Sequence, residues 1–267
     1  CRDFAMQLQL GNPQGAGEGV GDSGLGHKQD CAMIERISPV DLPNLIHRLR
    51  RVFSHMQFRL SRRYRGDPRG RALDMGKSIR NSFRFGGELF FIRRRRKKRR
   101  QPQVVVLCDV SASMIQYAGF TVPLLFAIAR SARNSDAFVC AGDLEPVTEY
   151  FRQNQGFSAA VEKLLQETVQ VGRGTQLGHA FRQLLHQPEL SLNSSSCLLI
   201  ISDAETVEPE ASALALKALS GRVRRIIWLN TQRRDQWNRD VTRDFRRYCH
   251  MEECTSLQRT IQLIKSM

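Results

Sequence analysis

Residues 104–113 read VVVLCDVSAS, an apolar run that ends in three oxygen-bearing side chains at alternate positions. Four aliphatic residues without a polar break predict a strand that is buried on both faces, as central parallel strands are. Ligands of open α/β sheets bind at the carboxyl edge, so the residues after this strand are candidates for a site. The carboxylate of Asp109 and the hydroxyls of Ser111 and Ser113 suit a hard cation such as Mg²⁺, which takes oxygen ligands.

The pattern after residue 102 alternates between strands and helices. Strands are predicted at residues 104–108, 137–141, 197–202 and 224–229, with a short edge strand at 146–150. Helices are predicted at residues 115–133, 158–168, 176–186, 208–219 and 256–264. This alternation indicates βαβ units, and therefore an α/β fold with a doubly wound, mostly parallel sheet that is flanked by helices.

Two further oxygen-bearing residues fall where this topology brings them to the same edge of the sheet. Thr175 follows a Gly-Arg-Gly turn at the start of the helix predicted at 176–186, and Asp203 directly follows the strand predicted at 197–202. Because the carboxyl ends of neighbouring parallel strands share one edge, these residues join the three above as candidate metal ligands. We predict Mg²⁺ or Mn²⁺ as the cation, since both accept oxygen ligands.

Other chemistries fit parts of this sequence less well. Asp and Ser are common turn residues, so residues 109–113 alone also fit an ordinary hydrogen-bonded turn. Asp109 as a phosphorylated nucleophile would need a second carboxylate two residues on and a lysine partner, neither of which is evident. Cys249, His250 and Cys254 lack a convincing fourth zinc ligand. No phosphate-binding glycine loop is found, so the chain is not expected to hydrolyse ATP or to be an enzyme.

Positive charge is concentrated in the first 102 residues, which carry 23 Lys and Arg against 9 Asp and Glu. Residues 1–37 contain a glycine-rich stretch that cannot build a packed core, and they are predicted to form a flexible tail. Residues 38–102 are predicted to form a basic helical extension and connector. Residues 103–267 have a nearly balanced charge and are predicted to form the globular domain that carries the site.

The basic extension contains two predicted helices, at residues 41–56 and 74–83, and a short predicted strand at 88–92. Eight consecutive cations follow, from Arg93 to Arg100. We interpret this run as a solvated connector that docks on an acidic surface of a partner protein. Binding of nucleic acid is the alternative, but the run itself lacks aromatic residues that would stack on bases.

The cysteines indicate the cellular compartment of the protein, and the apolar runs indicate whether the chain crosses a membrane. Cys108, Cys140 and Cys197 lie in or beside apolar runs, where free cysteine serves as a small core residue, so we expect a reducing cytoplasm. The longest apolar run, at residues 120–129, is interrupted by a threonine and a proline. It is shorter than the roughly 20 residues that a membrane helix needs, so no transmembrane segment is predicted.

The candidate ligands resemble the metal-ion-dependent adhesion site of von Willebrand factor A (VWA) domains: Asp-x-Ser-x-Ser, a distant Thr after a glycine turn, and a strand-terminal Asp. The resemblance implies that the metal ligands are Asp109, Ser111, Ser113, Thr175 and Asp203. The hydroxyls would contact the cation, and the carboxylates would act directly or through waters. The resemblance also implies that a carboxylate from another protein fills the open coordination position, because uncharged ligands leave the cation under-neutralised.

Two residues depart from this VWA pattern. Ala112 stands where many relatives have Gly, at a variable position, and it alters the interpretation little. Ala204 follows Asp203 where Gly is frequent, and it is expected to change the loop backbone because Gly permits dihedral angles that Ala resists.

Further features resemble the CoxE-like branch of VWA domains over residues 73–267, about three-quarters of the chain. They are residues 73–88, the basic run, the Cys-Asp-Val-Ser strand end at 108–111 and the Ile-Trp-Leu-Asn strand end at 227–230. This resemblance implies a non-enzymatic adaptor or chaperone that works with a MoxR-type AAA+ ATPase in the maturation of metalloenzymes such as carbon monoxide dehydrogenase. The alternative is a nucleic-acid-associated scaffold that uses the basic N-terminal arm.

Overall fold

The structure, a computed structural model, describes residues 36–55, 59–88, 91–100, 103–132, 134–152, 156–188, 190–254 and 256–265. The chain divides into two units, one comprising residues 1–56 and 103–267 and the other residues 57–102. We call them the sheet unit and the basic unit. The flexible tail predicted at 1–37 lies outside the described residues except for its last two positions.

The sheet unit is built on a six-stranded sheet whose order is β6-β5-β4-β7-β8-β9 in the described part of the chain. Neighbouring strands are parallel except for the pair of β5 with β6, which is antiparallel. The strands are β4 (Val104–Asp109), β5 (Ser135–Cys140), β6 (Leu144–Pro146), β7 (Cys197–Ile201), β8 (Arg225–Asn230) and β9 (His250–Glu253). This sheet confirms the predicted doubly wound α/β class.

The centre of the sheet is the pair β4 and β7, in which every residue is buried. Their apolar side chains occupy both faces of the sheet, which explains why neither sequence alternates with polar residues. The chain leaves β4 toward β5 on one side and leaves β7 toward β8 on the other. The carboxyl ends of these two strands therefore form the topological switch point, where α/β sheets bind ligands.

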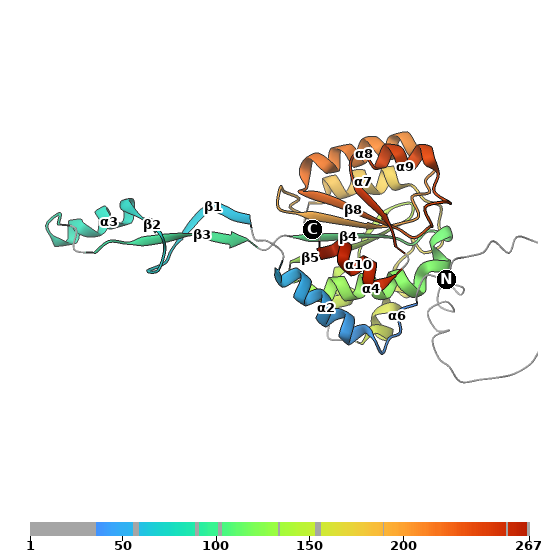
Figure 1. Cartoon of the computed structure of the whole chain (residues 1–267), viewed down its shortest axis with the longest axis horizontal. Helices are drawn as coiled ribbons and strands as arrows, with labels where there is room; N and C mark the ends of the chain where they lie inside the picture. Colours follow the sequence, from blue (N-terminus) through green and yellow to red (C-terminus); the bar gives the residue numbers. More distant parts are fainter. Residues whose placement is uncertain are drawn as a thin grey trace, which may run out of the picture. The chain divides into compact units, whose positions relative to one another are not determined.

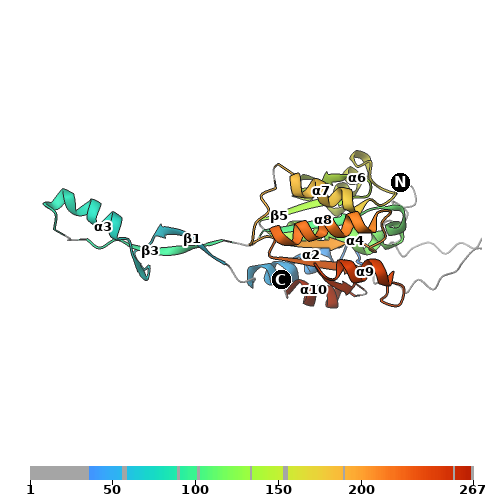
Figure 2. The ribbon, with the colours of Figure 1, turned by 90° about the horizontal axis from the view of Figure 1, so that it is seen from above.

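Helices cover both faces of the sheet, as Figure 1 shows. One face is covered by α2 (Leu42–His55), α4 (Ala118–Ser131), α5 (Thr148–Arg152), α6 (Phe157–Glu167) and α10 (Leu257–Lys265). The other face is covered by α7 (Leu177–His186), α8 (Pro209–Arg222) and α9 (Arg239–Phe245), and Figure 2 looks onto this face. Apolar side chains of these helices pack against the sheet or against one another, and the two cores are separated by the strands.

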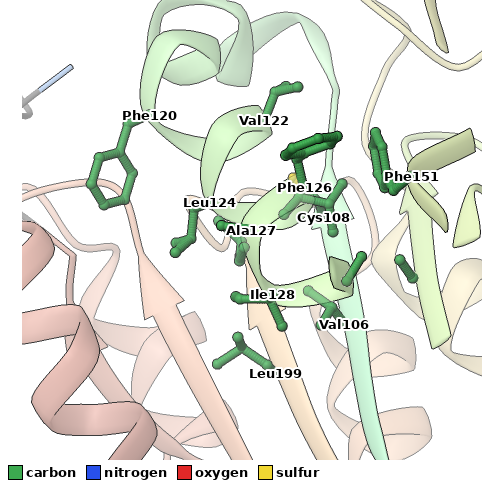
Figure 3. Packing of buried hydrophobic residues seen from close by; sticks show 14 of the residues in the cluster. Val106, Cys108, Phe120, Val122, Leu124, Phe126, Ala127, Ile128, Phe151 and Leu199 are labelled. Carbon is green, nitrogen blue, oxygen red and sulfur yellow. The ribbon is translucent and has the colours of Figure 1, made fainter. Parts of the chain in front are cut away.

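The helix α4 is the most deeply buried helix of the first face. Phe126 packs edge-on against Phe151, with their ring centroids 5.7 Å apart, and nearby side chains of α4 lie over β4 and β7 (Figure 3). Among the described residues, the one segment apolar and long enough to cross a membrane is 112–131, with a mean hydropathy of 1.5 and 67% of it buried. Packing against the sheet accounts for this apolar character.

The helix α2 belongs to the sheet unit, although its residues were predicted to lie in the basic extension. Its residues Leu42, Leu45 and Leu49 are buried in the core beside α4 and α10. Pro123 of α4 has no N–H, which frees the carbonyl of Gly119 from its place in the helix. The N–H of Ile37 donates to that carbonyl at 3.2 Å, so the segment before α2 is also held on α4.

Several elements differ from the predictions. The predicted edge strand at 146–150 is found earlier, at β6, and residues 148–152 form the helix α5 instead. Neither α9 nor β9 was predicted, because both are short and rich in charged residues. The other predicted strands and helices of the sheet unit are observed with ends shifted by at most three residues, and the predicted helix at 115–133 is preceded by a 3₁₀ turn, η2 (Ala112–Tyr117).

The basic unit contains an antiparallel sheet with the order β1-β3-β2 in its described part. Its elements are β1 (Arg59–Gly66), β2 (Ala72–Leu73), α3 (Met75–Ser82), the 3₁₀ turn η1 (Phe83–Phe85) and β3 (Arg94–Arg100). The predicted connector at 93–100 is therefore a central strand, a correction to the sequence interpretation. Its backbone pairs with both neighbouring strands, which needs no apolar side chain. The strand predicted at 88–92 is not found at the described residues 88, 91 and 92.

Candidate metal centre

Asp109 is the last residue of β4, and its side chain is almost completely buried. Its Oδ1 accepts a hydrogen bond from the backbone N–H of Ser111 at 2.9 Å. Its Oδ2 accepts one from the hydroxyl of Ser202 at 2.8 Å. Both carboxylate oxygens are thus held in place by residues of two different loops, so the group is oriented before any ligand arrives.

Ser111 and Ser113 lie on the turn that leaves β4. Their hydroxyl oxygens are 3.3 Å apart, so both side chains lie on the same side of the turn. Ala112 between them is exposed, in agreement with its place at a variable position of the pattern. Ser113 already belongs to η2, which leads directly into α4. The buried side chains of η2 and α4 hold the turn in place.

Asp203 follows the end of β7, the strand beside β4. Its Oδ1 accepts from the N–H of Glu205 at 3.0 Å, whereas its buried Oδ2 has no hydrogen-bond partner in the described structure. A buried carboxylate oxygen without a partner carries a desolvation cost of a few kcal/mol. This oxygen is a buried acceptor that stays open at this edge of the sheet.

The loop after Asp203 has an unusual backbone. Ala204 has φ 66°, and it is the one residue other than glycine with positive φ among those described. Ala in this left-handed region is strained by about 1–2 kcal/mol. The strained turn is held by the hydroxyl of Ser202, which accepts from the N–H of Ala204 at 3.1 Å.

Thr175 comes to the site through backbone contacts of its loop. Gly172, with φ 81°, donates its N–H to the carbonyl of Val110 at 2.9 Å, and the N–H of Ala112 donates to Arg173 at 3.1 Å. On the other side, the N–H of Val207 donates to the carbonyl of Thr175 at 3.2 Å. The backbone around Thr175 is therefore held between the loop after β4 and the loop after β7.

Burial disfavours the charged form of both carboxylates of the site. Burial raises the pKa of Asp109 from 3.8 to about 7, and the neighbouring charge of Asp203 contributes to this rise. Burial also raises the pKa of Asp203, while the side chain of Ser113 works against this increase. A divalent cation between the two groups would reverse both effects, because it stabilises the ionised forms.

The donor set therefore fits a hard divalent cation. The five candidate side chains offer carboxylate and hydroxyl oxygens, which suit Mg²⁺ or Mn²⁺ better than a soft metal. The described residues contain no cluster of three or more His, Cys, Asp or Glu that would hold a metal. The cysteines weighed as zinc ligands instead make contacts within the fold: the thiol of Cys249 donates to the carbonyl of Phe245, and Cys254 contacts Thr260.

Two supporting residues were not identified from the sequence. Ser202, described above, was assigned only to the end of a predicted strand. Asn230 ends β8, and its Nδ2 donates to the carbonyl of Asp203 at 3.3 Å while its Oδ1 accepts from Gln232. A polar residue at the end of a buried strand was the available signal for both, since a polar group at that place needs a buried partner.

A sheet of this order, with an Asp-x-Ser-x-Ser turn and a second aspartate at its switch point, defines a VWA domain. The family model described as "VWA domain containing CoxE-like protein" matches residues 45–265. The chain therefore belongs to the CoxE-like VWA family, a group of protein-interaction modules. No protein of curated function matches the chain significantly.

Solved structures with related folds show low sequence identity. Conserved hypothetical protein BatB from Bacteroides thetaiotaomicron is 14% identical, with a TM-score of 0.43, over 62% of this chain and 96% of that chain. The manganese-loaded TRAP protein from Plasmodium vivax is 14% identical, with a TM-score of 0.44, over 62% and 72%. A von Willebrand factor type A protein from Catenulispora acidiphila is 12% identical, with a TM-score of 0.40, over 66% and 43%.

Proposed function

We propose that this chain is a metal-dependent protein-binding module. Asp109, Ser111, Ser113, Thr175 and Asp203 would hold Mg²⁺, with Mn²⁺ as the other candidate. The observation that carries the proposal is the buried pair of carboxylates at the switch point, one of which has an oxygen without a partner. When bound, the cation would supply a positively charged coordination position for a carboxylate of another protein.

The residues of the proposed site have distinct parts. The hydroxyls of Ser111, Ser113 and Thr175 provide neutral oxygens, which leave the site with less negative charge than a cage of carboxylates. Ser202 and the N–H of Ser111 hold Asp109, and the N–H of Glu205 holds Asp203. An acidic side chain from a partner would then complete the site with a charge–charge contact that is strong where water is excluded.

We further propose that the partner is a MoxR-type AAA+ ATPase, and that the pair acts in the maturation of a metalloenzyme. Membership in the CoxE-like family supports this role. The chain would act as an adaptor or chaperone without catalysis of its own. A cytoplasmic location goes with the proposal, since the described cysteines are free thiols and thiols stay reduced in that compartment.

The test is capture of a candidate AAA+ ATPase by the immobilised full chain, with Mg²⁺ or with EDTA. Asp109→Ala and Thr175→Ala remove candidate ligands, and we expect EDTA or either substitution to reduce capture at least tenfold. Asp136→Ala is the matched control, because Asp136 lies on β5 and its carboxylate bonds Gln103 rather than the site. Equal capture under all conditions would overturn the proposal.

A further inference from the structure

The basic unit carries nearly all of the chain's net charge. Residues 57–102 contain 17 Lys and Arg but only 3 Asp and Glu. Five cations, Lys77, Arg80, Arg84, Arg93 and Arg94, line an open cleft of about 670 Å³. None of the five forms an ion pair with a described acidic side chain, and the one acid of the cleft, Asp67, is paired with Arg96 at 2.9 Å.

The buried side of helix α3 carries serines rather than large apolar side chains. Ser78 is buried, and its hydroxyl accepts from the N–H of Arg93 at 2.8 Å. Ser82, four residues on, is buried on the same side of the helix. Asp74 caps the helix by accepting from the N–H of Lys77 at 3.2 Å. The helix is therefore fixed in place while its large side chains remain outside.

Those large side chains form two stripes on the exposed surface of α3 and η1. Lys77, Arg80 and Arg84 follow one another at three- and four-residue spacing and line the cleft. Met75, Ile79 and Phe83 recur every four residues on the neighbouring stripe, and they are 51%, 44% and 74% exposed. Met75 and Ile79 would ordinarily pack against a core, but here the serines occupy that side.

Apolar exposure is concentrated in this unit. Seven of the eleven large apolar side chains that are exposed in the described structure lie between residues 73 and 92. Besides the stripe on α3 they include Phe85 and Phe91, whose ring centroids are 5.7 Å apart, and Ile92. Exposed apolar groups beside a cationic cleft mark a surface that another molecule covers.

We infer that the basic unit docks on an anionic membrane surface. Cations of the cleft would contact lipid phosphates, and the stripe of Met75, Ile79 and Phe83 would enter the boundary between headgroups and acyl chains. A short helix with a cationic stripe beside an apolar one has the side-chain order that interfacial helices use. Nucleic acid fits the observations less well, because bases stack on aromatic rings and would leave Met75, Ile79 and Ile92 in water.

The experiment is co-sedimentation of the full chain with vesicles of phosphatidylcholine alone, or of phosphatidylcholine with 30% phosphatidylserine. We expect binding to the anionic vesicles, weakening with salt, and little binding to the neutral ones. The triple variant K77Q/R80Q/R84Q should bind about 100-fold more weakly. The pair I79S/F83S, which keeps the net charge, should bind roughly 10-fold more weakly.

Matched controls remove the same groups elsewhere. R239Q/R243Q/R246Q removes three cations from a second basic cleft in the sheet unit, and V169S/L214S removes two exposed apolar side chains elsewhere in that unit. Both controls should bind like the unaltered chain, and EDTA should leave the binding of the unaltered chain unchanged, since vesicle binding does not depend on the proposed metal. Circular dichroism verifies that each variant is folded. If a variant does not fold, the salt dependence of binding by the unaltered chain still tests the inference.

Three results would overturn the inference. The first is equal binding to neutral and anionic vesicles. The second is an equal loss in the charge control and in the cleft variant. The third is binding of single-stranded RNA or of an acidic peptide that requires Lys77, Arg80 and Arg84 but is unaffected by I79S/F83S, with no vesicle binding. That result would assign the cleft to a soluble polyanion.

Discussion

Asp109 is the residue of the candidate metal centre whose ionised form is most strongly disfavoured. It is buried at the end of a central strand, and a second carboxylate faces the same edge of the sheet. The backbone N–H of Ser111 and the hydroxyl of Ser202 offset part of this cost, but they do not restore an ordinary pKa. The metal-free protein therefore holds a group that binds a proton more tightly when folded than when unfolded.

This residue predicts a pH dependence of stability in EDTA. The folded pKa of Asp109 is about 7 against 3.8, so its favourable contribution is complete below pH 4 and is lost as pH rises through 7. Denaturant unfolding at pH 4.5 and pH 7.5 should show a loss on the order of 2–4 kcal/mol that Asp109→Asn lacks. Parallel pH curves for the two proteins would contradict this expectation, and Mg²⁺ should stabilise only the unaltered chain.

Ala204 gives a second prediction at the residue scale. Ala204→Gly relieves the left-handed strain, about 1–2 kcal/mol, but loses a buried methyl group worth about 0.8 kcal/mol and costs about 0.5–1 kcal/mol of backbone entropy. We expect these effects to offset each other, with a change in unfolding free energy below about 0.5 kcal/mol. Ala141→Gly is the control, since Ala141 is buried without positive φ, and it should destabilise by about 1–2 kcal/mol. Equal losses in the two variants would refute the strain argument.

At the scale of elements, the sequence predicted the strands and helices that a pattern of apolar residues marks. The strands β4, β5, β7 and β8 are apolar and buried, and their ends carry the two aspartates of the site. The sequence did not reveal β3 or β9, because hydrogen bonds between backbones hold these strands while nearly all of their side chains are charged or polar. The supporting residues Ser202 and Asn230 were missed for a related reason: they act through contacts with residues distant in the sequence.

The basic sheet depends on one glycine that side-chain patterns do not indicate. Gly70 ends the turn from β1 to β2, where its N–H donates to Asp67 at 2.9 Å. A Cβ at this position would collide with the backbone carbonyl of Arg95 in β3, whereas a Cβ on Gly76 in α3 meets nothing within 4 Å. The close approach of two backbones therefore requires glycine at Gly70 but not at Gly76.

We predict opposite effects for alanine at these two positions. Gly70→Ala should separate β2 from β3 and accelerate amide hydrogen exchange in both strands at least tenfold. Gly76→Ala should slow exchange in α3, because alanine favours a helix over glycine by about 1 kcal/mol. Exchange rates in the sheet unit serve as the internal control. Unchanged exchange of β2 and β3 in Gly70→Ala would show that this sheet does not depend on the close approach.

At the scale of the whole molecule, the basic unit is inserted between two parts of one domain. The helix α2 precedes residues 57–102 and β4 follows them, yet both belong to the sheet unit. The charge map predicted the boundary near residue 102 but assigned α2 to the basic side. Amphipathic periodicity identifies a helix, but it does not identify the surface that its apolar stripe covers.

This organisation makes a last prediction about two deletions. Replacing residues 57–102 with a short Gly-Ser linker should preserve the melting temperature of the sheet unit and its response to Mg²⁺, because none of the described residues within 57–102 belongs to the core of that unit. Removing residues 1–102 deletes α2 as well, with four buried residues, Leu42, Leu45, Leu49 and Val52. Each is worth about 1.5–3 kcal/mol when buried, so their loss exceeds the 5 kcal/mol or so that many domains have. We therefore expect the second deletion to unfold or aggregate in circular dichroism and light scattering, and a stable, Mg²⁺-responsive 103–267 fragment would show that α2 is dispensable.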